Sequence, residues 1–251
     1  MAMSDRVQSV DRAFGLLEHM ADAGGSVALS QLATMSGLPL PTIHRLVRSL
    51  VNQGYVRQEQ SRRYALGPGL IRLGESANRM LGSWAVPYLS ELVDRIGETA
   101  NMAMLEGDTV VYVAQVPSLH SMRMFTEVGR RVMPHCTGVG KALLTMLPDD
   151  EVRALVARTG MPARTERTLT DPEALVAEVA ASRERGYAVD DQEQEAGVRC
   201  VAVPVSDAPV RVAISVSGPS SRVSAGRVAA IAPVLQGVAA RLVADLGVDG
   251  G

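Results

Sequence analysis

The first quarter of the chain alternates between helical patterns and residues that form turns. Apolar residues recur at helical spacing over residues 8–21, and Gly24-Gly25 interrupt this pattern. A shorter helix is expected over residues 31–36, with Ser30 as its N-cap and Gly37 as its stop. The chain therefore begins with two consecutive helices separated by a glycine-containing turn.

A third helix is expected over residues 41–53, because Pro41 suits a first helical turn and a regular apolar stripe follows it. The stripe recurs every three or four residues: Ile43, Leu46, Val47 and Leu50. Residues 55–66 then alternate as two short strands around a polar turn that carries arginines. Three helices followed by a hairpin predict a winged helix-turn-helix over residues 5–67.

The rest of the chain predicts a second domain behind a connector helix, which is expected over residues 68–84. Further helices are expected at 86–96, 140–147, 149–159, 171–185 and about 224–246. Strands are expected at 101–105, 110–116, 122–125, 187–190, 199–205 and 211–217. Helices that flank hairpin-connected strands indicate an α+β domain with a mainly antiparallel sheet over residues 85–247.

Composition excludes several classes of protein. Hydrophobic residues make up 47% of the chain and charged residues 21%, as in ordinary globular proteins. Apolar stretches such as Val110–Ala114 have strand length, and no apolar leader core follows Met1, so we expect a cytoplasmic protein without a membrane partner. Cys136 and Cys200 match neither a disulfide framework nor a zinc-binding spacing.

Charge is distributed unevenly along the chain. Residues 40–67 contain five arginines and the single acid Glu59, a local charge of +4, whereas the whole chain carries −2 and the remainder therefore −6. The expected third helix turns Arg45, Arg48 and Asn52 away from its apolar stripe. A small basic module with a polar helix face on an acidic body suggests a partner that carries negative charge.

These residue types suit the major groove of double-stranded DNA. The second helix of a helix-turn-helix enters that groove, where arginine pairs with guanine and shorter polar side chains add contacts. The predicted contacts come from the third helix and from two arginines at the tip of the wing, which would reach flanking phosphates or the minor groove: Thr42, His44, Arg45, Arg48, Asn52, Arg62 and Arg63. The sequence therefore predicts a DNA-binding protein.

Several longer motifs resemble the IclR family of bacterial transcriptional regulators over nearly the whole chain. In the first domain they are Gln8-Ser9-Val10-Asp11-Arg12-Ala13-Phe14, Ser36-Gly37-Leu38-Pro39, Thr42-Ile43-His44-Arg45-Leu46 and Tyr64-Ala65-Leu66-Gly67. In the second they include His135-Cys136-Thr137-Gly138-Val139-Gly140-Lys141-Ala142, Gly186-Tyr187-Ala188-Val189-Asp190 and Ile214-Ser215-Val216-Ser217-Gly218-Pro219. The resemblance implies a GAF-like effector domain, a homodimer or tetramer, and a palindromic operator whose binding a ligand controls. Repression is the commoner outcome in that family.

An effector pocket is expected in the second domain. Ser215 and Ser217 are two apart on a strand, so their hydroxyls share one face, and the amides that open the helix at Gly138 could hold an anionic oxygen. By resemblance, the contacts to the ligand come from Met124, Val132, Gly138, Val139, Asp190, Cys200, Ser215 and Ser217. Such a pocket favours a small polar or acidic metabolite, for which glyoxylate and an allantoin-pathway intermediate are candidates. The family more often has small residues where this chain has Cys136.

Two other classes of function and one structural alternative remain to be weighed. An enzyme would need a nucleophile, a base and an orienting group, or a phosphate loop, and the chain shows no complete set; no catalytic residue, metal or cofactor is expected. A winged helix can also bind RNA or protein. The connector around Leu70–Leu81 and Trp84 is a candidate for part of the dimer contact, with a helix buried inside one chain as the equal alternative.

Overall fold

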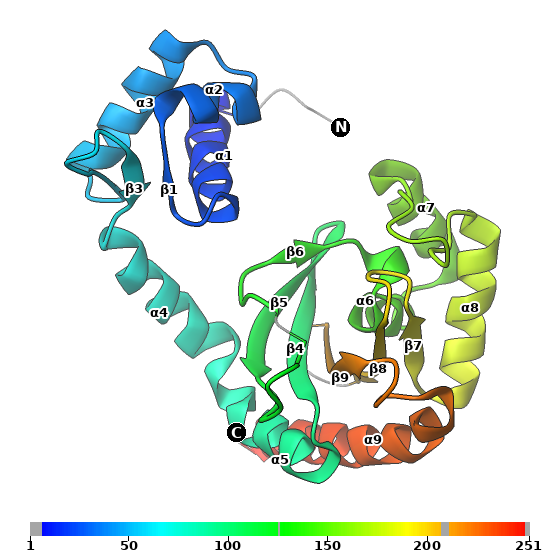
Figure 1. Cartoon of the computed structure of the whole chain (residues 1–251). Coiled ribbons are helices and arrows are strands. Elements are labelled where there is room, and N and C mark those ends of the chain that lie inside the picture. Colours follow the sequence, from blue (N-terminus) through cyan, green and yellow to red (C-terminus); the bar gives the residue numbers. More distant parts are fainter. Residues whose placement is uncertain (1–6, 125, 207–210, 249–251) are drawn as a thin grey trace. The chain divides into compact units, whose positions relative to one another are not determined.

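The computed structural model describes residues 7–124, 126–206 and 211–248 (Figure 1). The chain divides into two compact units, Met1–Ala77 and Asn78–Gly251, and each is described by itself. Both helices and antiparallel strands are present, which confirms the predicted α+β class.

The N-terminal unit is a winged helix-turn-helix. Its elements in chain order are α1 (Gln8–Asp22), β1 (Ser26–Val27), α2 (Leu29–Ser36), α3 (Leu40–Asn52), β2 (Val56–Gln58) and β3 (Tyr64–Leu66). The strands form an antiparallel sheet in the order β1-β3-β2, so the wing hairpin is anchored by a third strand that precedes α2. The apolar stripe of α3 packs into the core of this unit, where Ile43 and Val47 are buried with Leu16, Met20 and Leu32 of α1 and α2.

The start of α2 differs from the expectation. The helix begins at Leu29, with Ala28 rather than Ser30 at the N-cap position. Gln31 replaces the missing cap, since its side-chain Oε1 accepts a hydrogen bond from the Ala28 amide at 3.0 Å. The predicted stop is confirmed: Gly37 adopts the left-handed conformation with φ of 66°, which glycine adopts without strain.

A single helix, α4 (Gly69–Leu81), follows the wing, and the division between the two units falls inside it. Every residue from Ile71 to Met80 is exposed, so this chain alone gives α4 no buried face there. A short 3-10 helix (Ser83–Ala85) follows, in which Trp84 packs against the core of the C-terminal unit. The two alternatives for the connector, part of a dimer contact or a helix buried within one chain, both stay predictions.

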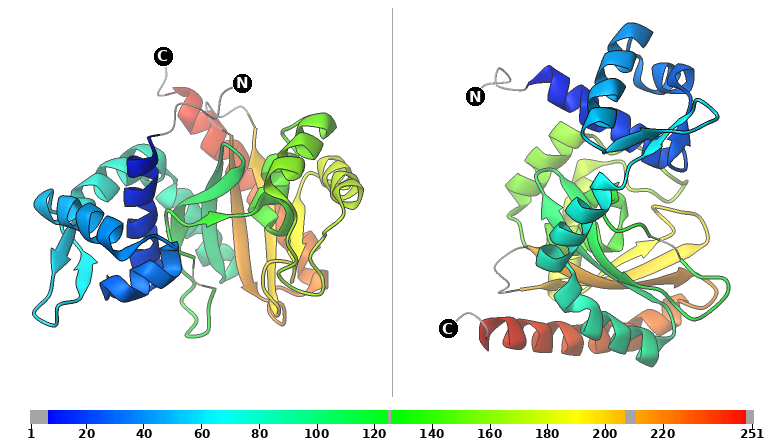
Figure 2. Two further views of the ribbon diagram at one scale, coloured as in Figure 1. Left: turned by 90° about the horizontal axis from the view of Figure 1, so that it is seen from above. Right: turned by 90° about the vertical axis from the view of Figure 1, so that its left-hand side faces the viewer.

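The C-terminal unit is built on a six-stranded antiparallel sheet in the order β6-β5-β4-β9-β8-β7 (Figures 1 and 2). Its strands are β4 (Thr99–Glu106), β5 (Thr109–Val116), β6 (Arg131–Val132), β7 (Ala188–Asp191), β8 (Val198–Val205) and β9 (Val212–Pro219). Its helices are α5 (Val86–Ile96), α6 (Gly138–Leu144), α7 (Asp149–Thr159), α8 (Pro172–Arg185) and α9 (Ala225–Val248), with a 3-10 turn at Pro134–Cys136. The antiparallel arrangement predicted for this domain is confirmed.

Alternation along the strands gives the sheet two different faces. On β9, Val212, Ile214 and Val216 face the large core that α5 and α9 cover. The intervening positions and their neighbours on the other face carry alanines that pack against α6: Ala103, Ala188, Ala202 and Ala213. These small side chains let α6 lie close to the sheet and leave the same face free to carry polar groups beside them.

The strand expected over residues 122–125 is wrong over its described part. Residues 122–124 form no strand, and Phe125 lies outside the described residues. Side chains, rather than a neighbouring strand, bind the carbonyls of this segment: Thr99 Oγ1 donates to Met124 O at 3.0 Å, and Arg222 donates to Met122 O at 2.9 Å. The edge strand is β6 instead, which pairs with β5.

The C-terminal helix corrects one expectation about length. The stretch Ala225–Asp245 of α9 is long and apolar enough to cross a membrane by length and composition alone, so the expectation that apolar stretches have only strand length is wrong here. One face of this helix packs on the sheet, where Ile231, Leu235, Val238 and Leu242 are almost fully buried. The helix thus has the burial pattern of a helix that covers a sheet, and its hydropathy reflects that packing.

Candidate functional site

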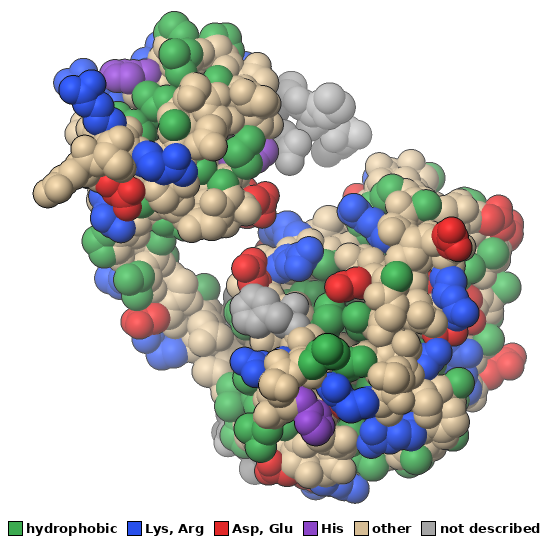
Figure 3. Space-filling model, in the orientation of Figure 1, with side chains coloured by type: hydrophobic (Ala, Val, Ile, Leu, Met, Phe, Trp, Pro, Cys, Tyr) green, Lys and Arg blue, Asp and Glu red, His purple; other side chains and the backbone are tan. Residues whose placement is uncertain are grey.

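The outer face of α3 carries unpaired cations. Ile43 and Val47 are buried, so Arg45 and Arg48 on the opposite side of the helix are exposed, as are His44 and Asn52. Among the residues that the structure describes, neither the Arg45 nor the Arg48 guanidinium forms a hydrogen bond or ion pair. Basic side chains gather on the side of this unit formed by α3 and the wing (Figure 3). The arrangement leaves both guanidinium groups available to an outside acceptor.

The two arginines of the wing differ. Arg62 is exposed in the turn between β2 and β3, with φ of 62°. The Arg63 guanidinium instead folds back on β1, where it donates to Ser26 O at 2.6 Å and to Ser26 Oγ at 3.4 Å. The sequence placed both side chains at the tip of the wing, whereas the structure leaves only the Arg62 side chain free there. Thr42, the remaining predicted contact, is half-buried on the shoulder of α3.

In the C-terminal unit, strand register brings the predicted polar residues together. Ser217 on β9 pairs with Thr99 on β4 and with Cys200 on β8, and Cys200 pairs in turn with Asp190 on β7. Residues that pair across strands point to the same face, so these four side chains form one row across four strands. We call this row the polar row; its members are Thr99, Ser217, Cys200 and Asp190. Ser215 lies two residues along β9 from Ser217 and therefore faces the same side.

A β-bulge adds residues that the sequence does not suggest. The register shifts between Met102 and Ala103, so that Asn101 pairs with Gln115 while Ala103 pairs with Tyr112. Gln115 and Tyr112 thus both lie on the face of the polar row, although three positions separate them. Gln115 Nε2 donates to Asn101 Oδ1 at 3.0 Å, and Asn101 Nδ2 donates to Ser217 Oγ at 3.4 Å. Asn101 inside a strand of apolar neighbours was the one available sequence signal.

The Ser215 hydroxyl and the Cys200 thiol are buried side by side on the face of the polar row. The Ser215 hydroxyl is buried and makes no hydrogen bond of normal geometry in the described part of the chain. Burial raises the pKa of the Cys200 thiol to about 11, while the hydroxyls of Ser217 and Ser215 nearby act in the opposite direction. A Cβ on Gly138 would lie 2.7 Å from Cys200 Sγ, so the start of α6 meets β8 through glycine. An unsatisfied buried hydroxyl is costly unless a ligand or water binds it.

Asp190 is a buried carboxyl at the end of the polar row. Its Oδ1 accepts the amides of Glu193 at 2.7 Å and Gln194 at 3.4 Å. Burial raises its pKa to about 7, the Glu193 charge adds to the rise, and the two amides and Lys141 oppose it. Asp190 can therefore be either a neutral donor or a charged acceptor near neutral pH.

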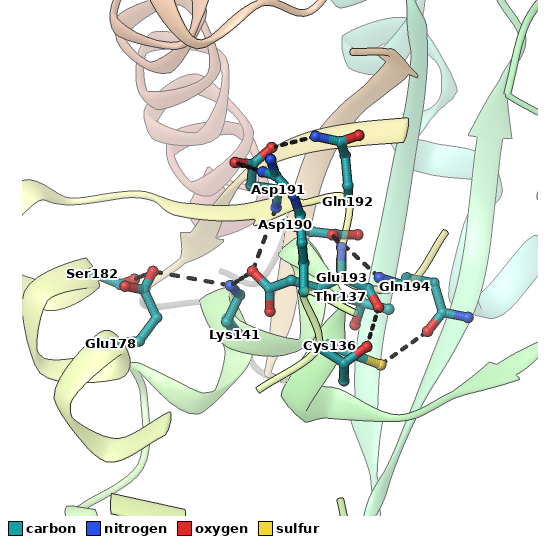
Figure 4. Close-up of polar contacts among 12 residues, drawn as sticks. Cys136, Thr137, Lys141, Glu178, Ser182, Asp190, Asp191, Gln192, Glu193 and Gln194 are labelled. Atoms are coloured by element: carbon teal, nitrogen blue, oxygen red, sulfur yellow. Dashed lines mark hydrogen bonds and ion pairs between the residues drawn. The ribbon is translucent and has the colours of Figure 1, made fainter. Parts of the chain in front are cut away.

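Lys141 holds the loop after β7 against α6. It is 1% exposed, and its Nζ lies 2.6 Å from Glu193 Oε1 and 4.0 Å from Glu178 Oε1 (Figure 4). The other Glu193 oxygen, Oε2, is buried and accepts no hydrogen bond from the residues that the structure describes. Because Lys141 is already shared by two acids, it offers no free positive charge to a ligand.

Cys136 and His135 are adjacent but act separately. The Cys136 thiol donates to Gln194 Oε1 at 2.9 Å (Figure 4), and burial raises its pKa to about 12, so the sulfur stays protonated. His135 Nε2 lies 3.2 Å from Pro162 O instead. The geometry therefore contains no base in contact with the thiol, and the described residues contain no cluster of three or more groups that could hold a metal.

Fewer backbone amides are free to hold an anionic oxygen at the start of α6 than the sequence predicts, because Thr137 binds two of them. Thr137 Oγ1 accepts the Gly140 amide at 3.2 Å and Thr137 O accepts the Lys141 amide at 2.9 Å. The predicted apolar wall, Met124 and Val132, is split: Val132 packs beside Val139 in the cluster beneath α6, whereas the backbone carbonyl of Met124 is held by Thr99. The structure thus gathers most of the predicted effector contacts around the polar row, with Met124 tied to a loop.

A large groove of the C-terminal unit lies elsewhere. It has a volume of about 710 Å³ and lies between the end of α8, β8 and α9, with Arg183, Ser182 and Gln236 in its lining. The Arg183 guanidinium is already bound to the carbonyls of Thr145 and Leu147. Because the polar groups of this groove are largely hydrogen-bonded within the protein, we place the candidate site at the polar row and not in the groove.

A helix-turn-helix with free cations on its outer helix, joined to an α+β unit with a buried polar row, defines a DNA-binding transcriptional regulator. The family models confirm this class: the IclR helix-turn-helix domain matches residues 9–60, and the bacterial transcriptional regulator IclR C-terminal domain matches residues 77–244. The chain belongs to the IclR family.

Individual relatives agree with this assignment. The transcriptional repressor IclR of Escherichia coli is 39% identical over 230 residues, which cover 89% of this chain and 84% of that protein. A transcriptional regulator from Rhodococcus has 31% identity and a TM-score of 0.81, over 98% of this chain and 100% of that one. An IclR homologue from Microbacterium hydrocarbonoxydans, solved with 4-hydroxybenzoate, has 25% identity and a TM-score of 0.80, over 96% and 99%. These relatives are regulators rather than enzymes.

Proposed function

We propose that this protein is a repressor that binds a palindromic DNA operator through α3 and releases or tightens its hold when a small molecule binds in the C-terminal unit. The exposed, unpaired guanidinium groups of Arg45 and Arg48 carry the proposal, because unpaired arginines on a recognition helix match guanine edges in the major groove. His44, Asn52 and Thr42 supply further contacts to bases or phosphates, and Arg62 supplies phosphate contacts from the wing. The E. coli relative named a repressor supports repression as the direction.

The polar row of the C-terminal unit is the proposed effector site. The unsatisfied Ser215 hydroxyl, the carboxyl of Asp190 and the hydroxyl of Ser217 would bind polar atoms of the effector, with Val132 and Val139 as apolar contacts. The homologue solved with 4-hydroxybenzoate supports a small organic acid as the chemical class. Glyoxylate and allantoin-pathway intermediates, the metabolites suggested by the sequence, belong among the first compounds to test.

An apolar surface on the N-terminal unit supports a homodimer. Val10 and Phe14 on α1 are 51% and 62% exposed, and Ile71 and Leu73 on α4 are 62% and 44% exposed. An apolar groove of about 360 Å³ lies among α1, α3 and α4, with Phe14 and Leu73 in its lining. A second copy would cover this surface and would provide the second recognition helix that a palindromic operator requires. Pairing of dimers into tetramers belongs to the same proposal, and a cytoplasmic location follows from a DNA partner.

The experiment that tests the proposal combines DNA selection with metabolites. Random duplexes are selected on the full-length protein, with and without a cell metabolite extract, and the enriched duplex is then titrated in a gel-shift assay. We expect an inverted repeat to be enriched and its affinity to change when the active metabolite is added. Failure of the selection to enrich any duplex would contradict the proposal and favour an RNA or protein partner.

A further inference from the structure

The wing carries one acid among its arginines, and nothing described so far assigns it a role. Glu59 directly follows β2 and is the single acid between residues 40 and 67, a window that contains five arginines. A carboxylate on a module that binds DNA repels phosphates and therefore lowers affinity. The contacts that Glu59 makes inside the N-terminal unit show what it contributes in return.

Glu59 ties the wing to β1. Its Oε2 accepts the Ser26 hydroxyl at 3.1 Å and the Ser61 hydroxyl at 3.4 Å. Ser26 lies on β1, one outer strand of the three-stranded sheet, whereas Glu59 follows β2, the other outer strand. Arg63, which precedes the middle strand, also donates to Ser26. The three side chains of Ser26, Glu59 and Arg63 thus connect all three strands.

Glu59 also pairs with Arg57 of β2. Its Oε1 lies 3.5 Å from Arg57 Nη2. In the strand register, Ser26 and Arg57 both pair with Ala65 of β3, one from each side, so Ser26 and Arg57 face the same side of the sheet. One carboxylate therefore holds a hydroxyl of β1 with one oxygen and a guanidinium of β2 with the other.

These contacts decide which arginines of the wing are available to DNA. Arg57 is paired although its side chain is 60% exposed, and Arg63 is bound to Ser26. Among the residues that the structure describes, the exposed Arg62 guanidinium forms no hydrogen bond or ion pair. The backbone of Glu59 also shapes the turn that presents this group, because the Arg62 amide donates to Glu59 O at 2.9 Å.

An exposed ion pair is weak in water, so the pairing alone would not keep Arg57 from a phosphate. Two features strengthen the restraint. The Glu59 side chain is only 31% exposed and is fixed by two hydroxyl groups, so its carboxylate stays in place with little further loss of side-chain freedom. A phosphate that approaches Arg57 also approaches the Glu59 charge, which repels it.

We propose that Glu59 is a positioning residue that keeps Arg57 off the DNA backbone and presents Arg62 as the phosphate contact of the wing. This inference rests on the proposed function and deepens it, because it states which wing arginines meet the DNA and why. Sequence-independent affinity grows with every phosphate contact. Glu59 therefore limits that part of the affinity and leaves the choice of operator to α3.

The test is a double-mutant cycle of Glu59→Gln, Arg57→Gln and the two together in the full-length protein. Glu59→Gln keeps an oxygen acceptor for the Ser26 hydroxyl and removes the charge that holds Arg57. The matched control is Glu173→Gln, which makes the same change in net charge and releases the exposed Arg153 in the C-terminal unit. Binding to a duplex of unrelated sequence is measured by fluorescence anisotropy over a range of salt concentrations, and thermal unfolding shows that each variant is folded.

Glu59→Gln should steepen the slope of log K against log salt by about 1 and raise affinity on the order of tenfold near 0.1 M salt, because Arg57 gains one phosphate contact. Arg57→Gln alone and the double variant should keep the slope of the parent, since Arg57 contacts DNA only when the Glu59 charge is gone. Glu173→Gln should bind like the parent. A purely structural role of Glu59 would not make its effect depend on Arg57.

The inference is overturned if Glu59→Gln keeps the slope of the parent, if the double variant stays as steep as Glu59→Gln, or if Arg57→Gln alone flattens the slope by about 1. Each of these results leaves duplex binding by the parent in place and does not contradict the proposed function. A parent protein that binds no duplex at all would contradict the proposed function, and this inference with it.

Discussion

The Arg45 and Arg48 guanidinium groups are free because the opposite side of α3 is fully used by the core. Ile43 and Val47 are almost completely buried, which fixes the rotation of the helix and turns its basic face outward. In the wing, the half-buried Arg63 binds Ser26 through its guanidinium, whereas Arg62 is exposed. Neighbours in sequence can therefore have different functions, and single substitutions can separate them.

The two wing arginines should differ in their effect on salt dependence. Arg62→Ala should reduce the slope of log K against log salt by about 1, because one phosphate contact is lost while sequence preference is kept. Arg63→Ala should leave the slope nearly unchanged and lower the stability of the wing, since it removes the hydrogen bonds to Ser26. Filter binding over a range of salt concentrations measures the slope. Equal slopes for Arg62→Ala and the parent would exclude Arg62 as a phosphate contact.

Asp190 should make folding stability depend on pH in an unusual direction. Its pKa of about 7 in the folded state lies above the ordinary value of 3.8, so the folded state binds more protons between about pH 4 and pH 7. Stability should fall as pH rises through that window and be insensitive to this group above it. The groups that act on Asp190 are Glu193 and Lys141, with Cys200 and Tyr112 nearby.

Asp190→Asn should abolish this part of the pH dependence, which amounts to on the order of 2–4 kcal/mol for a shift of this size in a buried group. Urea unfolding of both proteins at pH 5, 6, 7 and 8 gives the comparison. If the parent and Asp190→Asn lose stability in parallel between pH 5 and pH 8, the pKa of Asp190 is not raised in the folded protein.

At the scale of elements, the sequence pattern predicts the features that depend on interactions between residues close together in the chain. The order of helices and wing, the left-handed stop at Gly37 and the antiparallel sheet all follow from periodicity and turn chemistry. The start of α2 was wrong because Gln31, rather than Ser30, caps it, and the strand at 122–125 was wrong because side chains bind its carbonyls. Both depend on which partner a polar group finds in three dimensions.

The candidate site shows the same division. Ser215 and Ser217 share a face by simple alternation, whereas Tyr112 and Gln115 reach that face only through a β-bulge, which has no sequence signature here. Asn101 joins the site because its amide lies between Gln115 and Ser217 of the neighbouring strands, and only the tertiary structure shows this. Strand register and long-range pairing therefore set the limit of prediction from sequence.

The approach of α6 to β8 predicts a matched pair of glycine substitutions. Gly138→Ala should destabilise the protein by roughly 1–3 kcal/mol, because the new Cβ would lie 2.7 Å from Cys200 Sγ. Gly237→Ala is the control: it has open space around its Cβ position inside α9, and should be neutral or stabilise by about 0.5–1 kcal/mol. Thermal unfolding measures both. Cys200→Ala in the Gly138→Ala background should restore part of the loss, and a lack of any loss would contradict the close contact.

At the scale of the whole molecule, two copies of the chain must bind one operator together. In the N-terminal unit, Val10 and Phe14 of α1 and Ile71 and Leu73 of α4 are exposed apolar side chains. A palindromic operator needs two recognition helices at a fixed separation of about one DNA turn. Assembly through the N-terminal unit would therefore link oligomeric state directly to DNA affinity.

Phe14→Glu should weaken the dimer and, with it, operator affinity, because it places a charge in the apolar surface that a second copy would cover. Sedimentation or light scattering reports the mass, and gel shift the affinity. Leu119→Glu is the control, since Leu119 is 94% exposed in a loop of the C-terminal unit and should change neither. A Phe14→Glu variant with the parent's mass and affinity would show that this surface is not the dimer contact.

The most direct test of the account is duplex selection with the double variant Arg45→Ala/Arg48→Ala beside the parent and Arg153→Ala, an exposed arginine of α7 paired with Glu173. The parent and Arg153→Ala should enrich the same inverted repeat. The double variant should bind this repeat more weakly by about 1–3 kcal/mol for each base contact removed, and it should lose its sequence preference. Enrichment of the same repeat with equal affinity by all three proteins would contradict the assignment of α3 as the recognition helix.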